Sequence, residues 1–140
     1  MEAESNLKRF LDAQQTDYRR ALAEIKTGRK QSHWMWYIFP QISGLGLSGT
    51  ARFYAIQDLN EARAYLEHPV LGSRLIEIAN ALLEIEGKTA YQIMGTPDDL
   101  KLRSSMTLFS LLEQTDPVFQ AVLDKFFDGL PDQRTVELVS

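Results

Sequence analysis

The segment GRKQSHWMWYIFPQ, residues 28–41, gathers basic, imidazole and indole side chains that could bind a ligand and act on it. If the segment is helical, His33 shares a face with Arg29 or Lys30 behind it and with Trp36 or Tyr37 ahead of it. A histidine held between cations tends to stay neutral, which suits a hydrogen-bond acceptor or a general base. We therefore predict His33 as a catalytic residue and Lys30, Trp34 and Trp36 as ligand-binding residues. One indole would stack on a base or sugar and the other would lie in the core; the alternative for His33 is a packing role beside tryptophan.

A glycine-rich segment, GLGLSGTAR at residues 44–52, leads into an expected short helix. Free backbone N–H groups at a helix start can hold an anion, and Arg52 would add positive charge. Gly44 and Gly46 are therefore predicted ligand-binding residues. The segment matches neither a Walker loop nor a dinucleotide fingerprint, because no lysine follows its last glycine and no parallel strand precedes it. A flexible connection is the alternative.

Polar side chains also concentrate in PDDLKLRSSMTLF, residues 97–109, which is predicted to be a helix. Paired carboxylates can do acid–base chemistry only where their pKa values are split. Capping and the helix dipole explain Asp98, and they leave Asp99 open as a catalytic carboxylate. The serines either supply hydroxyls to a cleft or permit close helix contact. The remaining predicted ligand-binding residues are Lys101, Arg103, Ser104 and Ser105.

Metal and cofactor chemistry has little support in the residue types. The sequence has no cysteine, and its two histidines, His33 and His68, have no acidic or histidine partner at ligand spacing. No metal site and no cofactor are therefore predicted.

The overall charge bears on the class of partner. The net charge is −4 and the pI is about 5.2, which argues against nucleic-acid binding, since that draws on clustered Lys and Arg. Locally, five basic residues are opposed only by Glu24, which suits a compact anion or, alternatively, a solvated helix face. The five are Arg19, Arg20, Lys26, Arg29 and Lys30.

No stretch approaches the roughly eighteen apolar residues that span a bilayer. The start, MEAESNLKRF, lacks the basic and apolar runs of a secretory signal. We expect a soluble, cytoplasmic protein without a membrane partner; its oligomeric state is not predicted.

The elements that must position these residues have helical patterns. A first short helix is expected near residues 7–11, and a second would begin with Thr16 as N-cap and end at Gly28. Residues 31–39 are interpreted as a helix rather than a buried strand, ended by Pro40. The clearest helix covers residues 70–86, where apolar residues recur at steps of three and four: Leu71, Leu75, Ile78, Leu82 and Ile85.

No period-two alternation persists, and there is no internal repeat or low-complexity linker. Asp58 with Glu61 and Thr89 mark further helix starts. The predicted fold class is therefore all-α. Residues 1–140 would form a single compact domain of about seven short helices, with an ordered core over about residues 5–139.

These blocks together resemble a family known as domain of unknown function 1810. The resemblance rests on GxKxSHWMWYIFPQ, then GLG, YAI, AYLxHPxLGxRL and DDxK through SSMTLF, and it covers nearly the whole chain. SHWMW and KLRSSMTLF are its specific parts. One departure is Met94, where the family leads us to expect phenylalanine and which implies only a packing change.

The resemblance implies a single all-helical domain and no established activity. The label calpastatin, sometimes given to such proteins, fits poorly because calpastatin uses long disordered repeats. By analogy alone, the combination of Trp, Gly-rich and polar-helix blocks is similar to a family that cleaves ADP-ribose derivatives at the N-glycosidic bond.

Two hypotheses follow. In the first, the predicted residues converge on a cleft that binds a small anionic ligand with an aromatic part, such as a nucleotide or ADP-ribose derivative. Hydrolysis there would use Asp99, with cations stabilising the developing charge. In the second, the protein is a non-catalytic interaction or structural domain, and the polar blocks lie apart.

Overall fold

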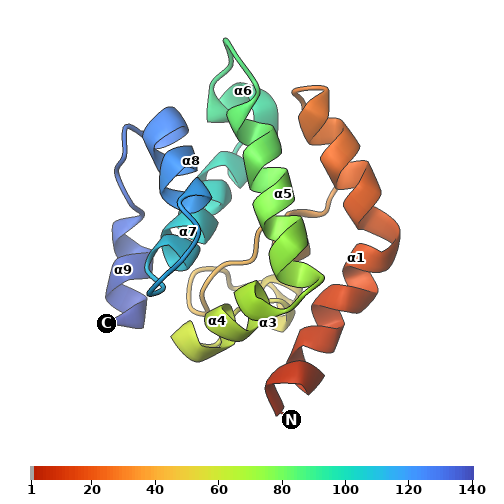
Figure 1. Ribbon diagram of the computed structural model, residues 1–140, viewed down its shortest axis with the longest axis vertical. Coiled ribbons are helices and arrows are strands. Elements are labelled where there is room, and N and C mark those ends of the chain that lie inside the picture. The colour runs from red at the N-terminus through yellow and green to blue at the C-terminus, as the bar shows by residue number, and fades with distance from the viewer. Residues whose placement is uncertain (1) are drawn as a thin grey trace.

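The longest helix, α1 (Glu2–Lys26), forms one side of the molecule in the computed structural model, which describes the backbone of residues 2–140 and the side chains of residues 6–140 (Figure 1). The predicted helix start at Thr16 is wrong. Buried residues recur at steps of three and four across it, so a single helix continues: Leu7, Phe10, Gln14, Tyr18, Ala21 and Ile25.

Gln14 is the one polar residue of this stripe, and its hydrogen bonds explain its burial. Its side chain is 2% exposed, and its Nε2 donates to the Tyr37 carbonyl at 2.7 Å and to the Tyr65 hydroxyl at 2.9 Å. Its Oε1 accepts from the Arg74 guanidinium at 3.4 Å, so both ends of the buried amide have partners. Gln14 therefore joins α1 to the rest of the core.

The segment that follows α1 is mostly irregular. Only one turn, α2 (Met35–Ile38), is helical, so the prediction of a helix over residues 31–39 is wrong for its first part. The reason is Glu24 on α1. Its carboxylate accepts hydrogen bonds from the backbone N–H groups of Gln31 and Ser32 at 2.7 and 2.9 Å, which holds these residues outside a helix.

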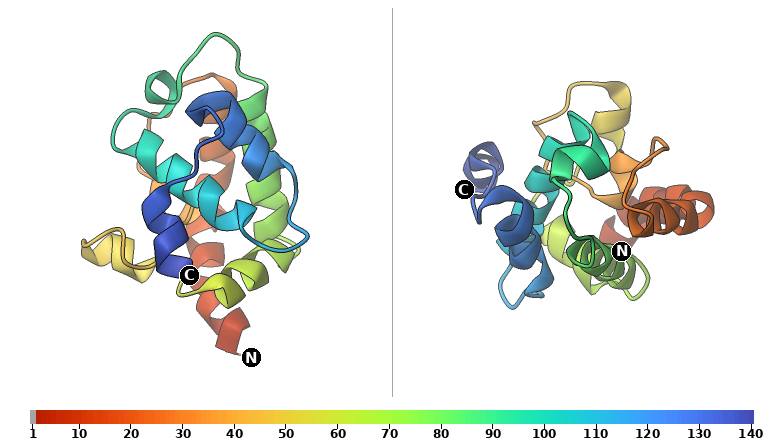
Figure 2. Two further views of the ribbon diagram at one scale, coloured as in Figure 1. Left: turned by 90° about the vertical axis from the view of Figure 1, so that its left-hand side faces the viewer. Right: turned by 90° about the horizontal axis from the view of Figure 1, so that it is seen from above.

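The chain then forms α3 (Gly49–Phe53) and α4 (Leu59–Glu67), which are connected by a short extended stretch. Residues 44–53 project from the body of the molecule (Figure 2). An isolated parallel bridge between Ile42 and Ile56 closes the base of this projection. Asp58 caps α4 as predicted, by accepting from the Glu61 N–H at 2.9 Å.

The core lies between α1 and the C-terminal helices. α5 (Leu71–Leu83) runs through the middle of the molecule, with α1 on one side and α7 (Asp98–Ser110) and α8 (Val118–Phe127) on the other (Figure 1). α5 ends three residues before the predicted Glu86. The stripe residues within the helix are buried as expected, whereas Ile85 beyond its end is half-buried. α7 and α8 pack through apolar side chains, among them Phe109 and Phe119 with ring centroids 5.6 Å apart.

Two further helices complete the fold. α6 (Ala90–Met94) begins with the complete capping box of Thr89 and Gln92. α9 (Gln133–Val139) packs on α7 and is capped by Asp132. Six of the helices in residues 2–140 have seven or more residues and three have four or five. The predicted all-α fold in one compact domain is confirmed.

None of the helices in residues 2–140 is both long enough and apolar enough to cross a membrane.

Candidate functional site

Glu24, near the end of α1, anchors the loop that carries the predicted site residues. Besides two backbone N–H groups, it accepts from the Ser32 hydroxyl at 2.6 Å and from the Trp34 indole N–H at 2.9 Å. Burial raises the pKa of Glu24, but these hydrogen bonds outweigh it and hold the pKa below its usual value. The one carboxylate in the basic stretch thus serves to fix the loop.

Lys30, Asp98 and Lys101 form a charged cluster between this loop and the start of α7. The Lys30 ammonium lies 2.9 Å from one Asp98 oxygen and the Lys101 ammonium lies 3.5 Å from the other. The Lys30 side chain is 7% exposed, and it also donates to the Ser32 carbonyl. Two of the predicted ligand-binding cations are therefore brought together, around the carboxylate that was assigned a structural role.

The two tryptophans differ in their access to solvent. Trp34 is fully buried beneath Lys30, whose ammonium lies 4.9 Å from its ring centroid. Trp36 is half-buried, with the Lys101 ammonium 5.1 Å from its ring centroid. Trp34 is thus the core indole, and only Trp36 retains an accessible surface.

Tyr37 ties the same segment back to α1. Its hydroxyl donates to the carboxylate of Asp17. Burial raises the pKa of Tyr37, and the hydrogen bond to Asp17 raises it further. Tyr37 is therefore a neutral structural donor at physiological pH.

The two predicted catalytic residues, His33 and Asp99, do not contact each other through a hydrogen bond or an ion pair. His33 is exposed, and its side chain makes no hydrogen bond within residues 6–140; its backbone carbonyl lies 3.4 Å from the Tyr37 hydroxyl. Asp99 is half-buried in the first turn of α7, where its carboxylate accepts from the Leu100 N–H at 2.9 Å. No ion pair or hydrogen bond within residues 6–140 links the two side chains.

Gly44 and Gly46 belong to the projecting segment. Gly44 has a φ of 105°, a conformation that favours glycine. A Cβ on Gly46 would lie 2.5 Å from the Cβ of Ala51, so Gly46 permits close packing against α3. Gly46 and Trp36 both line a small recess of about 10 Å³, which holds no more than a water. Both glycines thus have a structural explanation.

Arg103 and Ser104 face a different part of the molecule. The Arg103 guanidinium donates to the carbonyls of Leu130 and Pro131 at 2.9 and 3.0 Å. The Ser104 hydroxyl lies 3.2 Å from both the Leu100 carbonyl and a carboxylate oxygen of Asp132, and its single hydrogen is donated to one of them at a time. These contacts hold the connection between α8 and α9, so neither residue joins the Lys30 cluster.

Ser105 is completely buried, and its hydroxyl has no hydrogen-bond partner among the described residues. It lies within α7 among core positions and supplies no hydroxyl to a cleft. The predicted block KLRSS therefore divides between two faces of α7 and the core.

A recess lined by three cationic side chains and an aromatic one lies beside the loop, against α6. It has a volume of about 400 Å³, and the Lys30 N–H donates to the Ile93 carbonyl at 2.7 Å along its wall. Tyr91 stands at this recess with 61% of its surface exposed. The lining residues are Arg29, Lys30, Lys88, Tyr91, Gln92, Ile93, Met94 and Gly95. We call it the cationic recess.

Of its eight lining residues, only Lys30 was a predicted ligand-binding residue. Arg29 was predicted only as part of the basic stretch, and Lys88 and Tyr91 were not predicted at all. Lys88 lies in the turn after α5, and Tyr91 lies on the first turn of α6. Neither belongs to a recognisable motif. The available signal was Tyr91 itself, an aromatic residue on the polar side of a very short helix. Among residues 6–140, no three His, Asp or Glu side chains gather closely enough to hold a metal ion.

The fold and the site together define the protein as an all-helical domain with an open cationic recess. Its family is shown by comparison with known proteins. Residues 4–139 match the model described as "Protein of unknown function (DUF1810)", and the chain belongs to this family, as its motifs indicated.

A solved structure supports the fold. The chain is similar to the conserved hypothetical protein Rv1873 from Mycobacterium tuberculosis, with 47% identity and a TM-score of 0.94. The match covers 96% of each chain. Among curated proteins, none matches this chain.

Proposed function

We propose that the protein binds a small anionic ligand with an aromatic part, such as a nucleotide or ADP-ribose derivative, in the cationic recess. One observation carries the proposal: three cationic side chains and an exposed tyrosine line an open recess that has no carboxylate among its lining residues. Its volume of about 400 Å³ falls in the range of small-molecule sites.

The three cations differ in how much charge they offer. Lys30 is neutralised by Asp98. Arg29 is exposed, and within residues 6–140 neither Arg29 nor Lys88 forms an ion pair with a carboxylate. The Lys88 ammonium donates to the Gly28 carbonyl at 3.0 Å, which holds it beside the loop. Arg29 and Lys88 would therefore bind the anionic group, since two charges without partners favour an anion.

Tyr91 would bind the aromatic part. An exposed aromatic ring offers a face on which a base can stack whatever its hydrogen-bonding pattern. Gln92 contributes less, because its side-chain oxygen already accepts from the Thr89 N–H at 2.9 Å in the capping box. The proposal is restricted to binding, because neither His33 nor Asp99 is among the residues that line the recess.

The test is calorimetric titration with ADP, ADP-ribose and inorganic pyrophosphate. We expect R29Q and K88Q each to weaken binding by about tenfold, since a hydrogen bond to a charged group contributes about 1.5 kcal/mol. The matched control is R134Q, which removes an exposed arginine from α9, away from the lining residues.

A second variant separates the two parts of the ligand. Y91A is expected to lower the affinity for ADP by about fivefold, because stacking is lost, and to leave the affinity for pyrophosphate unchanged. If none of the three anions binds, or the R29Q/K88Q double variant binds them like the wild type, the proposal is wrong. The alternative, a non-catalytic interaction domain, would then be favoured.

A further inference from the structure

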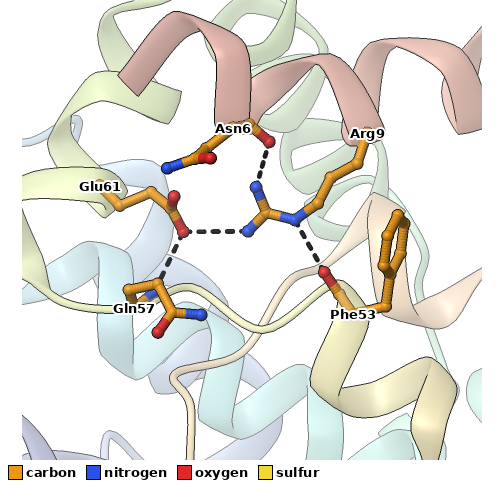
Figure 3. A pocket seen from close by; sticks show the side chains of 5 residues that line it. All are labelled: Asn6, Arg9, Phe53, Gln57 and Glu61. Atoms are coloured by element: carbon orange, nitrogen blue, oxygen red, sulfur yellow. Dashed lines mark hydrogen bonds and ion pairs between the residues drawn. The ribbon is translucent and has the colours of Figure 1, made fainter. Parts of the chain in front are cut away.

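A second recess lies at the opposite end of α1. Figure 1 shows that the start of this helix lies near α3 and α4. Its volume is about 440 Å³. Figure 3 shows the five side chains that line it, drawn from all three regions: Asn6, Arg9, Phe53, Gln57 and Glu61. We call it the neutral recess, because its two charges are paired with each other.

Arg9 and Glu61 form the floor of this recess as a largely buried ion pair. Arg9 Nη2 lies 3.0 Å from Glu61 Oε1, and the two side chains are 13% and 7% exposed. The same Glu61 oxygen accepts from the Gln57 N–H at 3.0 Å. Because the opposite charges are close and shielded from water, the recess as a whole offers neither an anion nor a cation a net attraction.

Each partner of this pair still has hydrogen-bonding capacity. Arg9 also donates to the carbonyls of Phe53, Ala55 and Asn6, so four of the roughly five guanidinium N–H groups are used. Glu61 Oε2 has no partner within residues 6–140 in the hydrogen bonds of the structure. One Arg9 N–H and one charged Glu61 oxygen are thus left without a partner in the described part of the chain.

The walls add two amides and an aromatic ring. The Asn6 side chain is exposed and makes no hydrogen bond in the described part of the chain, and the Gln57 amide makes only a long one, 3.4 Å to the Ala55 carbonyl. The Phe53 ring is 59% exposed at the rim opposite Glu61 (Figure 3). It is steadied by an edge-to-face contact with Tyr54, at 4.8 Å between ring centroids.

We propose that the neutral recess binds a neutral sugar. A hydroxyl group can donate to Glu61 Oε2 while it accepts from Arg9 or from one of the amides, which no simple anion or cation does. The apolar C–H face of the sugar would pack on the Phe53 ring. This site is independent of the cationic recess, from which it is separated by about 30 Å of helix, the rise of some twenty residues.

The experiment is an NMR titration of the labelled protein with D-glucose, D-galactose and D-ribose. Each sugar is taken to about 50 mM, because a shallow neutral site is expected to have a Kd of about 1 mM. The result expected is saturable shift changes at residues of the neutral recess for at least one sugar. F53A should lower the affinity for that sugar by about fivefold, because the ring contact is lost, and N6A should lower it by a smaller factor.

The controls keep the test independent of folding and of the cationic recess. L47A removes an exposed side chain from the same projecting segment without touching the lining, and it should bind like the wild type. F53A retains the backbone carbonyl to which Arg9 donates, so its thermal unfolding should stay close to wild type. R29Q/K88Q should bind the sugar unchanged.

Three results would overturn the proposal. One is the absence of saturable shifts with all three sugars, and another is wild-type affinity in both F53A and N6A. The third is loss of sugar binding in R29Q/K88Q, which would place the sugar in the cationic recess. Failure here leaves the anion titrations unaffected, because a neutral sugar and pyrophosphate use different groups.

Discussion

The two recesses at the ends of α1 use charge in opposite ways. In the neutral recess, Arg9 and Glu61 are largely buried and bonded to each other and to the backbone. In the cationic recess, Arg29 and Lys88 lie at the surface without a carboxylate partner in the described part of the chain. The first pair is held in contacts within the fold, so that removing one partner is costly, whereas the second pair contributes little to stability and is free to bind a ligand.

The largest change in stability is expected when the buried Arg9–Glu61 pair is broken. Replacing Glu61 by Ala leaves Arg9 with one fewer acceptor in a largely buried position, and such losses cost about 3 kcal/mol. The free energy of unfolding, measured with denaturant, should fall by about this amount. R29Q, the counterpart in the cationic recess, should change it by less than about 0.5 kcal/mol.

Equal effects of E61A and R29Q on stability would contradict this contrast between the recesses. A double variant, R9M/E61L, provides a further check. It replaces both charges together, so it should recover part of the stability that E61A loses.

An intermediate effect is expected at Glu24, which fixes the loop of the cationic recess. Glu24→Gln removes the charge that accepts from Ser32 and Trp34, and we expect a loss of about 2 kcal/mol at pH 7. The pKa of Glu24 is lower in the folded than in the unfolded protein. Its contribution is therefore fully present above the usual value of about 4.3 and is lost as pH falls through the folded pKa.

The measurement is unfolding of wild type and E24Q over a range of pH. The difference in stability between them should be constant above about pH 5 and should shrink as the pH falls further. A difference that grows towards acid pH would mean that the Glu24 carboxylate does not anchor the loop.

The smallest effects distinguish two adjacent serines of α7. The Ser104 hydroxyl has two acceptors within reach of its single hydrogen, so S104A should cost about 1 kcal/mol. The Ser105 hydroxyl is buried without a partner, so S105A should be neutral or stabilising by up to about 1 kcal/mol. Thermal unfolding of both variants provides the comparison. A larger loss in S105A than in S104A would show that Ser105 has a partner that the contacts above do not include.

The sequence predicted the elements whose signals are local. The apolar stripe of α5 and the caps at Asp58 and Thr89 depend on neighbouring residues, and all three are present in the structure. The start predicted at Thr16 was wrong, because Gln14 is held in the core by Tyr37 and Tyr65, far away in sequence. Local patterns cannot register such a contact.

The candidate site was less predictable for the same reason. Helical spacing suggested that Lys30, His33 and Trp36 share a face, but Glu24 holds the first part of this segment out of a helix. The position of Arg103 depends on the carbonyls of the chain after α8, which no motif indicates. Lys88 and Tyr91 reach the cationic recess only because the turn after α5 returns to the end of α1.

The most direct test of the central claim, that the cationic recess binds an anion through Arg29 and Lys88, is the salt dependence of ADP affinity. Exposed charges are screened by salt, so wild-type affinity should fall by about tenfold between roughly 0.05 and 0.5 M NaCl. The R29Q/K88Q variant should bind weakly with little dependence on salt. An ADP affinity that is insensitive to salt, or an equal dependence in the wild type and the double variant, would contradict the account.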